Sequence, residues 1–222
     1  MTTPITEANA TASQPKAESF VDWFNINSRM ITTGAVVVAL AAFGFWFVQR
    51  TALNAAVNSD RQLLVAKQSM NAGNAALAEA DLKKVVDKYG DKPAGAEAGM
   101  LLAQLRLDKG DFPGAVAGLR DLASKVSSGP NAAQVRGLLG DAISQSGKPA
   151  EAAGEYERAS GLSAGPNEKQ MWLSKAARAY VAAGNAVQAR KLYEALAAQS
   201  ENAAVAAEAR VRLGELTTSG KA

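Results

Sequence analysis

The chain has 222 residues and a net charge of +3, and 48% of its residues are hydrophobic but only 6% are aromatic. It contains no histidine and no cysteine, which excludes serine–histidine triads, thiolate nucleophiles, disulfides and the common zinc and iron–sulfur sites. Basic and acidic residues are interspersed, unlike the basic block of a nucleic-acid arm. We therefore expect no nucleic-acid partner, no cofactor, no metal and no enzymatic activity. A core of alanine and leucine with few rings favours an all-α fold.

The first 28 residues precede the first long apolar run. Residues 1–19 are rich in Thr, Ala, Ser, Glu and Pro, a composition typical of disorder. Residues 20–28 contain Phe20, Trp23 and Phe24 and are predicted to form a short interfacial segment.

Residues 30–48 contain no charged side chain. A helix of this length spans about 28 Å, close to the thickness of a bilayer's hydrocarbon core, so we expect a transmembrane helix over residues 29–50. The predicted membrane-interface residues are the aromatic side chains near its two ends, namely Trp23, Phe24, Phe43, Phe45, Trp46 and Phe47. A cleaved signal peptide is the alternative, but the long acidic segment before the apolar run disfavours it.

Residues 51–217 repeat with a period of 37 residues, and four columns of similar residues recur in four copies. They are Gly73, Gly110, Gly147 and Gly184; Ala78, Ala115, Ala152 and Ala189; Leu82, Leu119, Tyr156 and Tyr193; and the small residues Ala66, Ala103, Gly140 and Ala177. The pattern predicts four helical hairpins with a glycine closing each first helix. Asn74, Asp111 and Asn185 then cap the second helices, whereas Lys148 is followed by Pro149. Residues 202–216 are predicted to form a capping helix, and residues 218–222 a disordered tail.

Two pairs of carboxylates, Glu79 with Asp81 and Glu155 with Glu157, lie on predicted second helices. Residues two apart point away from each other on a helix, which argues against acid–base chemistry. We expect them on solvated faces, with Glu79 paired to Lys83 and Asp81 to Lys84. Trp172 is expected in the core, with partner binding as the alternative.

Residues 102–116 and 176–193 best display a small residue, a Gly-Asn or Gly-Asp turn, and Ala and Tyr or Leu in the second helix. This pattern resembles the tetratricopeptide repeat, although the period of that repeat is usually shorter. The resemblance implies a non-catalytic, protein-binding α-solenoid in which the first helix of each hairpin lines a concave groove. By register the groove residues are Leu63, Lys67, Met70, Met100, Gln104, Leu107, Asp141, Ser144, Met171, Ser174, Arg178 and Val181. The alternative is that these Met and Leu side chains only pack between units. A chaperone-type clamp is not expected, because position 67 is lysine where that clamp needs asparagine.

The order of segments, together with the stretch at residues 96–107, resembles the ancillary subunit of the bacterial SecYEG translocon. That resemblance implies a single-pass protein of the bacterial inner membrane with a periplasmic repeat domain. The implied partners are the translocon, chaperones and client proteins, besides the lipid bilayer. Basic residues near the span are almost evenly divided between its two sides, so charge does not choose the orientation. The alternative function is a structural subunit of a photosynthetic or respiratory membrane complex.

Overall fold

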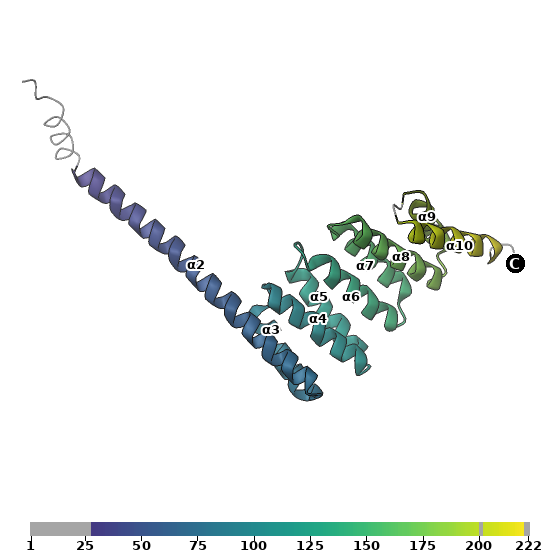
Figure 1. Cartoon of the computed structure of the whole chain (residues 1–222), viewed down its shortest axis with the longest axis horizontal. Coiled ribbons are helices and arrows are strands. Elements are labelled where there is room, and N and C mark those ends of the chain that lie inside the picture. The colour runs from purple at the N-terminus through teal and green to yellow at the C-terminus, as the bar shows by residue number, and fades with distance from the viewer. Residues whose placement is uncertain (1–27, 200–201, 220–222) are drawn as a thin grey trace, which may run out of the picture. The chain divides into compact units, whose positions relative to one another are not determined.

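The computed structural model describes residues 28–199 and 202–219, and these residues form nine helices and no strand (Figure 1). The helices are α2 (Ser28–Asn71), α3 (Ala75–Tyr89), α4 (Pro93–Asp108), α5 (Phe112–Lys125), α6 (Ala132–Gln145), α7 (Pro149–Leu162), α8 (Pro166–Ala182), α9 (Ala186–Gln199) and α10 (Ala203–Ser219). The all-α class is therefore confirmed. The predictions for residues 1–27, including Trp23 and Phe24, lie outside the described residues.

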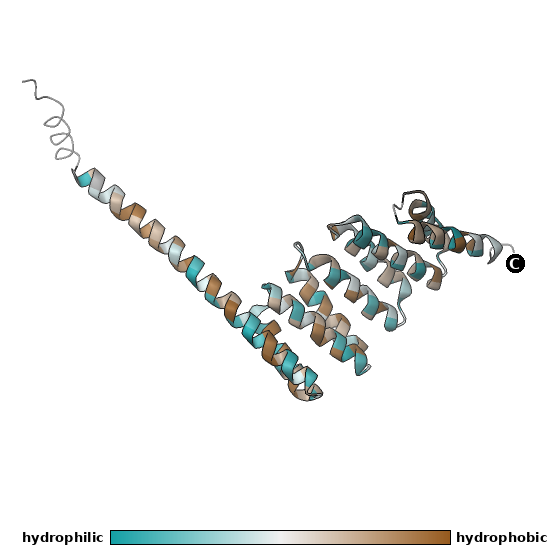
Figure 2. Cartoon of the chain, viewed as in Figure 1, coloured by the Kyte–Doolittle hydropathy of each residue, from teal (hydrophilic) through white to brown (hydrophobic). Residues whose placement is uncertain are grey.

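The chain divides into two compact units, one ending at Asn54 and the other beginning at Ala55. Helix α2 is continuous through this boundary. In the first unit it contains the apolar run, drawn mainly in brown and pale shades in Figure 2. Helix α2 is long enough and apolar enough to cross a membrane, and its most apolar stretch is not buried within the protein.

The second unit contains four antiparallel hairpins followed by α10. The last part of α2 packs against α3, and the later pairs are α4–α5, α6–α7 and α8–α9. The hairpins stack in sequence order, from blue through teal and green to yellow in Figure 1. The prediction of four hairpins and a capping helix is thus confirmed. Helix α10 runs to Ser219, so the predicted disorder of Thr218 was wrong. The Thr218 hydroxyl donates to the Gly214 carbonyl at 3.3 Å and satisfies part of the last turn.

The turn inside each hairpin follows the 37-residue pattern. The four turn glycines have positive φ, between 72° at Gly73 and 82° at Gly147. That left-handed conformation strains any residue with a β-carbon. The side-chain oxygens of Asn74, Asp111 and Asn185 accept a hydrogen bond from the backbone N–H three residues later. The predicted caps are therefore confirmed, and α7, which follows Lys148, has no side-chain cap.

The core is built from the repeating columns. All four column alanines are fully buried, and so are Leu82 and Leu119. In the third hairpin the equivalent residue is Tyr156, and its ring lies close to the backbone of Gly140. A β-carbon at position 140 would lie 2.6 Å from Tyr156 Cε1, closer than packed carbon atoms approach. The bulky residue and the missing side chain therefore compensate each other.

Candidate protein-binding face

The first helices of the hairpins form one side of the stacked array. Within the described part of the second unit, α4 approaches α6 and α8 approaches α10, whereas no two second helices of neighbouring hairpins approach to the same extent. This is the side of the array that the resemblance to the tetratricopeptide repeat assigns to the binding groove. We call the solvent-facing side chains of the first helices the inner face. With the equivalent residue of α10, its members include Lys67, Glu97, Gln104, Gln134, Asp141, Met171, Arg178 and Glu208.

Two predicted groove residues lie in the core. Leu63 packs in the cluster formed by α2, α3 and α4, and Leu107 packs in the large cluster of the middle hairpins; each is 6% exposed. Met70 and Met100 are half-buried against the same two clusters. For these four residues the side chains pack between helices, as the packing alternative predicts. Burial of Leu63 and Leu107 leaves them no surface for a partner.

The remaining predicted groove residues reach solvent. Lys67, Asp141 and Ser174 are half-buried, and Met171 is 44% exposed. The other four are also exposed, namely Gln104, Ser144, Arg178 and Val181. These residues come from α2, α4, α6 and α8. Their use in binding stays a prediction.

Ion pairs cross the inner face at its two ends. Lys67 of α2 pairs with Glu97 of α4, and Arg178 of α8 pairs with Glu208 of α10 at 2.6 Å. Both members of the second pair lie three 37-residue periods after those of the first. The repeat therefore places the same contact at the interface between the first two hairpins and at the interface between the fourth hairpin and α10. Each cation is engaged by the protein itself, which reduces its availability to a partner.

The positions between these ends carry no such pair. The equivalents of Lys67 and Glu97 are Gln104 and Gln134 at the next interface, then Asp141 and Met171. Gln104 donates to Asp108 of its own helix at 2.8 Å, and Gln134 is exposed. Amide groups can donate to and accept from a peptide backbone, and methionine adapts to varied apolar surfaces. Gln104, Gln134 and Met171 thus give the centre of the inner face uncharged side chains, beside the single carboxylate of Asp141.

Asp141 belongs to a cluster that joins the third and fourth hairpins. Its carboxylate accepts from the Tyr156 hydroxyl at 2.7 Å and pairs with Lys175 at 2.9 Å. The Lys175 ammonium lies 5.6 Å and 5.1 Å from the ring centroids of Tyr156 and Trp172, and these rings stack at 6.3 Å. Such contacts add to apolar burial. Trp172 is 6% exposed, so the prediction that it lies in the core is confirmed.

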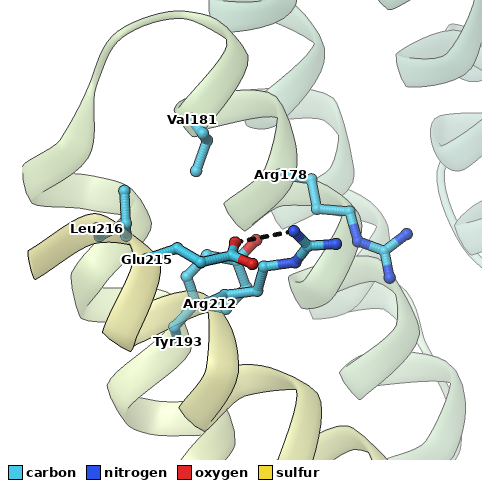
Figure 3. A pocket seen from close by; sticks show the side chains of 6 residues that line it. All are labelled: Arg178, Val181, Tyr193, Arg212, Glu215 and Leu216. Carbon is cyan, nitrogen blue, oxygen red and sulfur yellow. Dashed lines mark hydrogen bonds and ion pairs between the residues drawn. The ribbon is translucent and has the colours of Figure 1, made fainter. Parts of the chain in front are cut away.

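A hollow of about 320 Å³ lies at the carboxyl-terminal end of the array (Figure 3). The residues that line it come from α8, α9 and α10: Arg178, Val181, Tyr193, Arg212, Glu215 and Leu216. Arg212 pairs with Glu215 at 2.9 Å and lies 4.0 Å from Glu208. The two arginines are therefore balanced by two glutamates. The hollow therefore favours a ligand without net charge, and Val181, Tyr193 and Leu216 form its apolar wall.

The two carboxylate pairs do not behave as the sequence analysis predicted. Glu79 bonds to Lys109 at 2.6 Å instead of Lys83, which pairs with Asp87. The pKa of Glu79 is lowered, chiefly by the Lys109 hydrogen bond. Asp81 accepts from the Ser69 hydroxyl at 2.8 Å instead of pairing with Lys84. Spacing along one helix does not reveal partners on the neighbouring helix, and these contacts join α3 to α4 and α2.

Glu155 was wrongly predicted to be solvated. It is 7% exposed and bonds to two guanidinium groups, Arg136 of α6 at 3.1 Å and Arg158 of its own helix. Helix α6 covers this carboxylate, and the two guanidinium groups compensate its buried charge.

No group of three potential metal ligands occurs among residues 28–199 and 202–219.

Sequence reasoning did not identify Glu97, Gln134 and Glu208 as members of the inner face. The repeat itself contained the signal, because these three residues and Met171 occupy equivalent positions. A comparison of every column across the four copies, including the columns that vary, would have found them.

The aromatic residues of the apolar run all lie on α2. Phe43, Phe45, Trp46 and Phe47 are between 54% and 67% exposed. The ring of Phe43 lies 5.8 Å from Trp46 and 6.4 Å from Phe47, and the Arg50 guanidinium lies 5.9 Å from the Trp46 ring. A cluster of rings beside a cation at one end of an apolar helix is typical of a membrane interface.

The profile of one protein family, described as the tetratricopeptide repeat-like domain, matches residues 54–175, more than half of the chain. The chain belongs to this family. The tetratricopeptide repeat-like domains of such proteins are typically non-catalytic scaffolds that bind other proteins. No curated protein matches the sequence.

Several solved structures share the tetratricopeptide repeat-like fold. A putative kinesin light chain from Podosopora anserina with nearly identical repeats is 20% identical, with 73% of this chain and 86% of that one covered and a TM-score of 0.56. A tetratricopeptide repeat protein from Parabacteroides merdae is 14% identical, with 72% and 60% covered and a TM-score of 0.58. MamA is 19% identical, with 71% and 81% covered and a TM-score of 0.51. At these identities the likeness shows the fold alone.

Alkaline pH should destabilise the array through its tyrosines. Burial, and then the bond to Asp141, raise the pKa of Tyr156, and burial also raises the pKa of Tyr193. Above pH about 10 an unfolded tyrosine loses its proton while the buried one retains it, so stability falls by about 1.4 kcal/mol per pH unit for each such group. Urea titrations at several pH values should show a shallower loss for Tyr156→Phe than for the wild type. Parallel losses would contradict this assignment.

Proposed function

We propose that the chain is a single-pass membrane protein whose repeat domain holds other proteins on its inner face, at or near the translocon of the bacterial inner membrane. The observation that supports binding most directly is the centre of the inner face. There Gln134, Ser144 and Met171 are exposed, and Gln104 and Gln134 replace the ion pair found at the ends. A partner that contacts Gln104 and Gln134 need not first break an ion pair between these two positions.

Membrane anchoring is supported by the length, composition and exposure of the apolar run of α2. The position of the repeat domain in the periplasm rests on the resemblance in layout to the ancillary translocon subunit. The inferred partners are the translocon, periplasmic chaperones and clients that leave the translocon.

A structural subunit of a large membrane complex is the second candidate. The observation that favours it is the cluster of Phe43, Trp46 and Phe47 on α2, whose rings could pack on neighbouring transmembrane helices. Native gels of detergent extracts separate the two proposals. A stable complex in which this chain is stoichiometric would favour the subunit, and substoichiometric association with translocon proteins would favour the scaffold.

The span itself is tested by fractionation. The wild-type chain should stay in the membrane pellet after alkaline carbonate extraction and should retain its full length. Replacing both Val38 and Leu40 with lysine should release it, because each charge near the centre of a span costs about 3 kcal/mol. Val211→Lys, at an exposed site on α10, should not. A soluble wild-type chain, or one shortened by cleavage after the run, would contradict the proposal.

A further inference from the structure

A second hollow, of about 450 Å³, lies away from the inner face, on α5 and the turn between α6 and α7. Its apolar wall and its cationic rim are formed by Phe112, Pro113, Val116, Ala117, Arg120 and Lys148. Binding pockets commonly have volumes of about 300–1,000 Å³ and combine an apolar lining with a few polar groups. The hollow therefore has the size and composition of a ligand site.

Two of its residues depart from the repeat. The equivalents of Lys148 are Asn74, Asp111 and Asn185, all three of which cap a helix. Lys148 makes no side-chain cap, and loss of a cap lowers stability. A position that lacks a stabilising contact made at its equivalent positions is a candidate for a functional role.

Phe112 is the other departure. Its equivalents in the repeat are Ala75, Pro149 and Ala186, so only the second copy has an aromatic ring at this position. The ring is half-buried and packs beside Val116 against the core. Phe112 and Lys148, the two residues that differ from their equivalents in the repeat, thus line the same hollow.

The charges at the hollow do not balance. Arg120 of α5 pairs with Glu151, in the first turn of α7. Lys148 makes no ion pair among the residues that the structure describes, and it stands at the amino-terminal end of α7. The partial positive charge of that helix end adds to the lysine. The hollow is therefore positive overall and complementary to an acidic group.

We propose that this hollow binds a segment of a partner protein in which a carboxylate side chain stands next to a large apolar side chain. The apolar side chain packs on Phe112 and Val116, and the carboxylate pairs with the Lys148 ammonium. This second binding surface goes beyond the proposed function and does not depend on the inner face.

The test uses the labelled full-length chain in neutral detergent micelles on an array of immobilised random peptides. One set carries Asp or Glu beside Leu or Phe, a second carries Asn or Gln in place of the acid, and a third carries Ser in place of the apolar residue. Retention should be about tenfold higher on the first set, because the second set lacks the charge that pairs with Lys148 and the third lacks the side chain that packs on Phe112.

Variants then locate the binding. Lys148→Asn should reduce retention about tenfold while raising the melting temperature, because it restores the cap that the equivalent positions have. Phe112→Ala should also reduce retention and should fold, since the equivalent positions 75 and 186 are alanine. Lys191→Asn makes the same change of charge at an exposed site on α9 and should leave retention unchanged.

Equal retention on all three sets would overturn the proposal. The same result is expected if Lys148 instead binds phosphatidylglycerol that has been added to the micelles. Retention that survives both Lys148→Asn and Phe112→Ala would overturn it as well. Loss of this binding would leave contacts made through Gln134 and Met171 intact, so failure here is distinguishable from failure of the proposed function.

Discussion

Replacing Trp172 with alanine should lower the free energy of unfolding by about 3–5 kcal/mol, as is typical when a large buried aromatic side chain is removed. The ring stacks on Tyr156 of the third hairpin, lies under the Lys175 ammonium and is 6% exposed. It also fills the space beside Gly137, where a β-carbon would lie 2.1 Å from the ring atom Cη2. No side chain at position 137 can take over the vacated volume.

Urea denaturation followed by far-ultraviolet circular dichroism, on the full-length chain in detergent, measures this loss. Met171→Ala is the matched control, because the neighbouring side chain is 44% exposed and should change stability by no more than about 0.5 kcal/mol. Neighbouring units of a repeat protein are held together by their interfaces. The Trp172→Ala variant should therefore also lose the fourth hairpin and α10 before the rest. A single unshifted transition would contradict this role of Trp172.

Gly95→Ala should destabilise the protein by about 3 kcal/mol, at the upper end of the usual cost of overpacking. Gly95 is buried in the first turn of α4, where the loop after α3 passes closely. A β-carbon there would lie 1.7 Å from the Tyr89 carbonyl oxygen and 2.8 Å from the Gly90 Cα atom. Because the clash is with backbone atoms, a rotamer change cannot relieve it.

The same substitution at Gly154 is the control. Gly154 lies in the middle of α7, and a β-carbon there would have no atom within 4 Å. Alanine has the better helix propensity, so Gly154→Ala should stabilise the protein by about 0.5–1 kcal/mol. Thermal unfolding should move in opposite directions for the two variants. A shift of the same sign in both would show that helix propensity, and not close packing at Gly95, decides the effect.

The local elements of the fold were predictable from the sequence because a 37-residue repeat carries its own internal check. Gly73 and its equivalents end the first helices, and Asn74, Asp111 and Asn185 cap the second helices, at the positions that their chemistry demands. Each of these features depends on residues that are close in the chain. The solenoid then follows from stacking like units.

Contacts between helices were harder to predict. Glu155 was expected in solvent and is buried between two arginines, because α6 covers that part of α7. The compensating pair of Gly140 and Tyr156 depends on the separation of two helices, which composition does not reveal. Leu63 and Leu107 have groove register but point into the core. Helical register alone identifies a face to within about one residue in each turn, which is too coarse to separate a groove from the core beneath it.

Site-specific photocrosslinking in intact membranes tests the central claim most directly. A photoreactive residue at Gln134 or at Met171, both exposed on first helices, should join the chain to a second protein. The same residue at Glu194, exposed on the second helix α9, should give little or no product. Crosslinks from Glu194 that equal those from the inner face, or none from Gln134 and Met171, would contradict the claim that the inner face holds partner proteins.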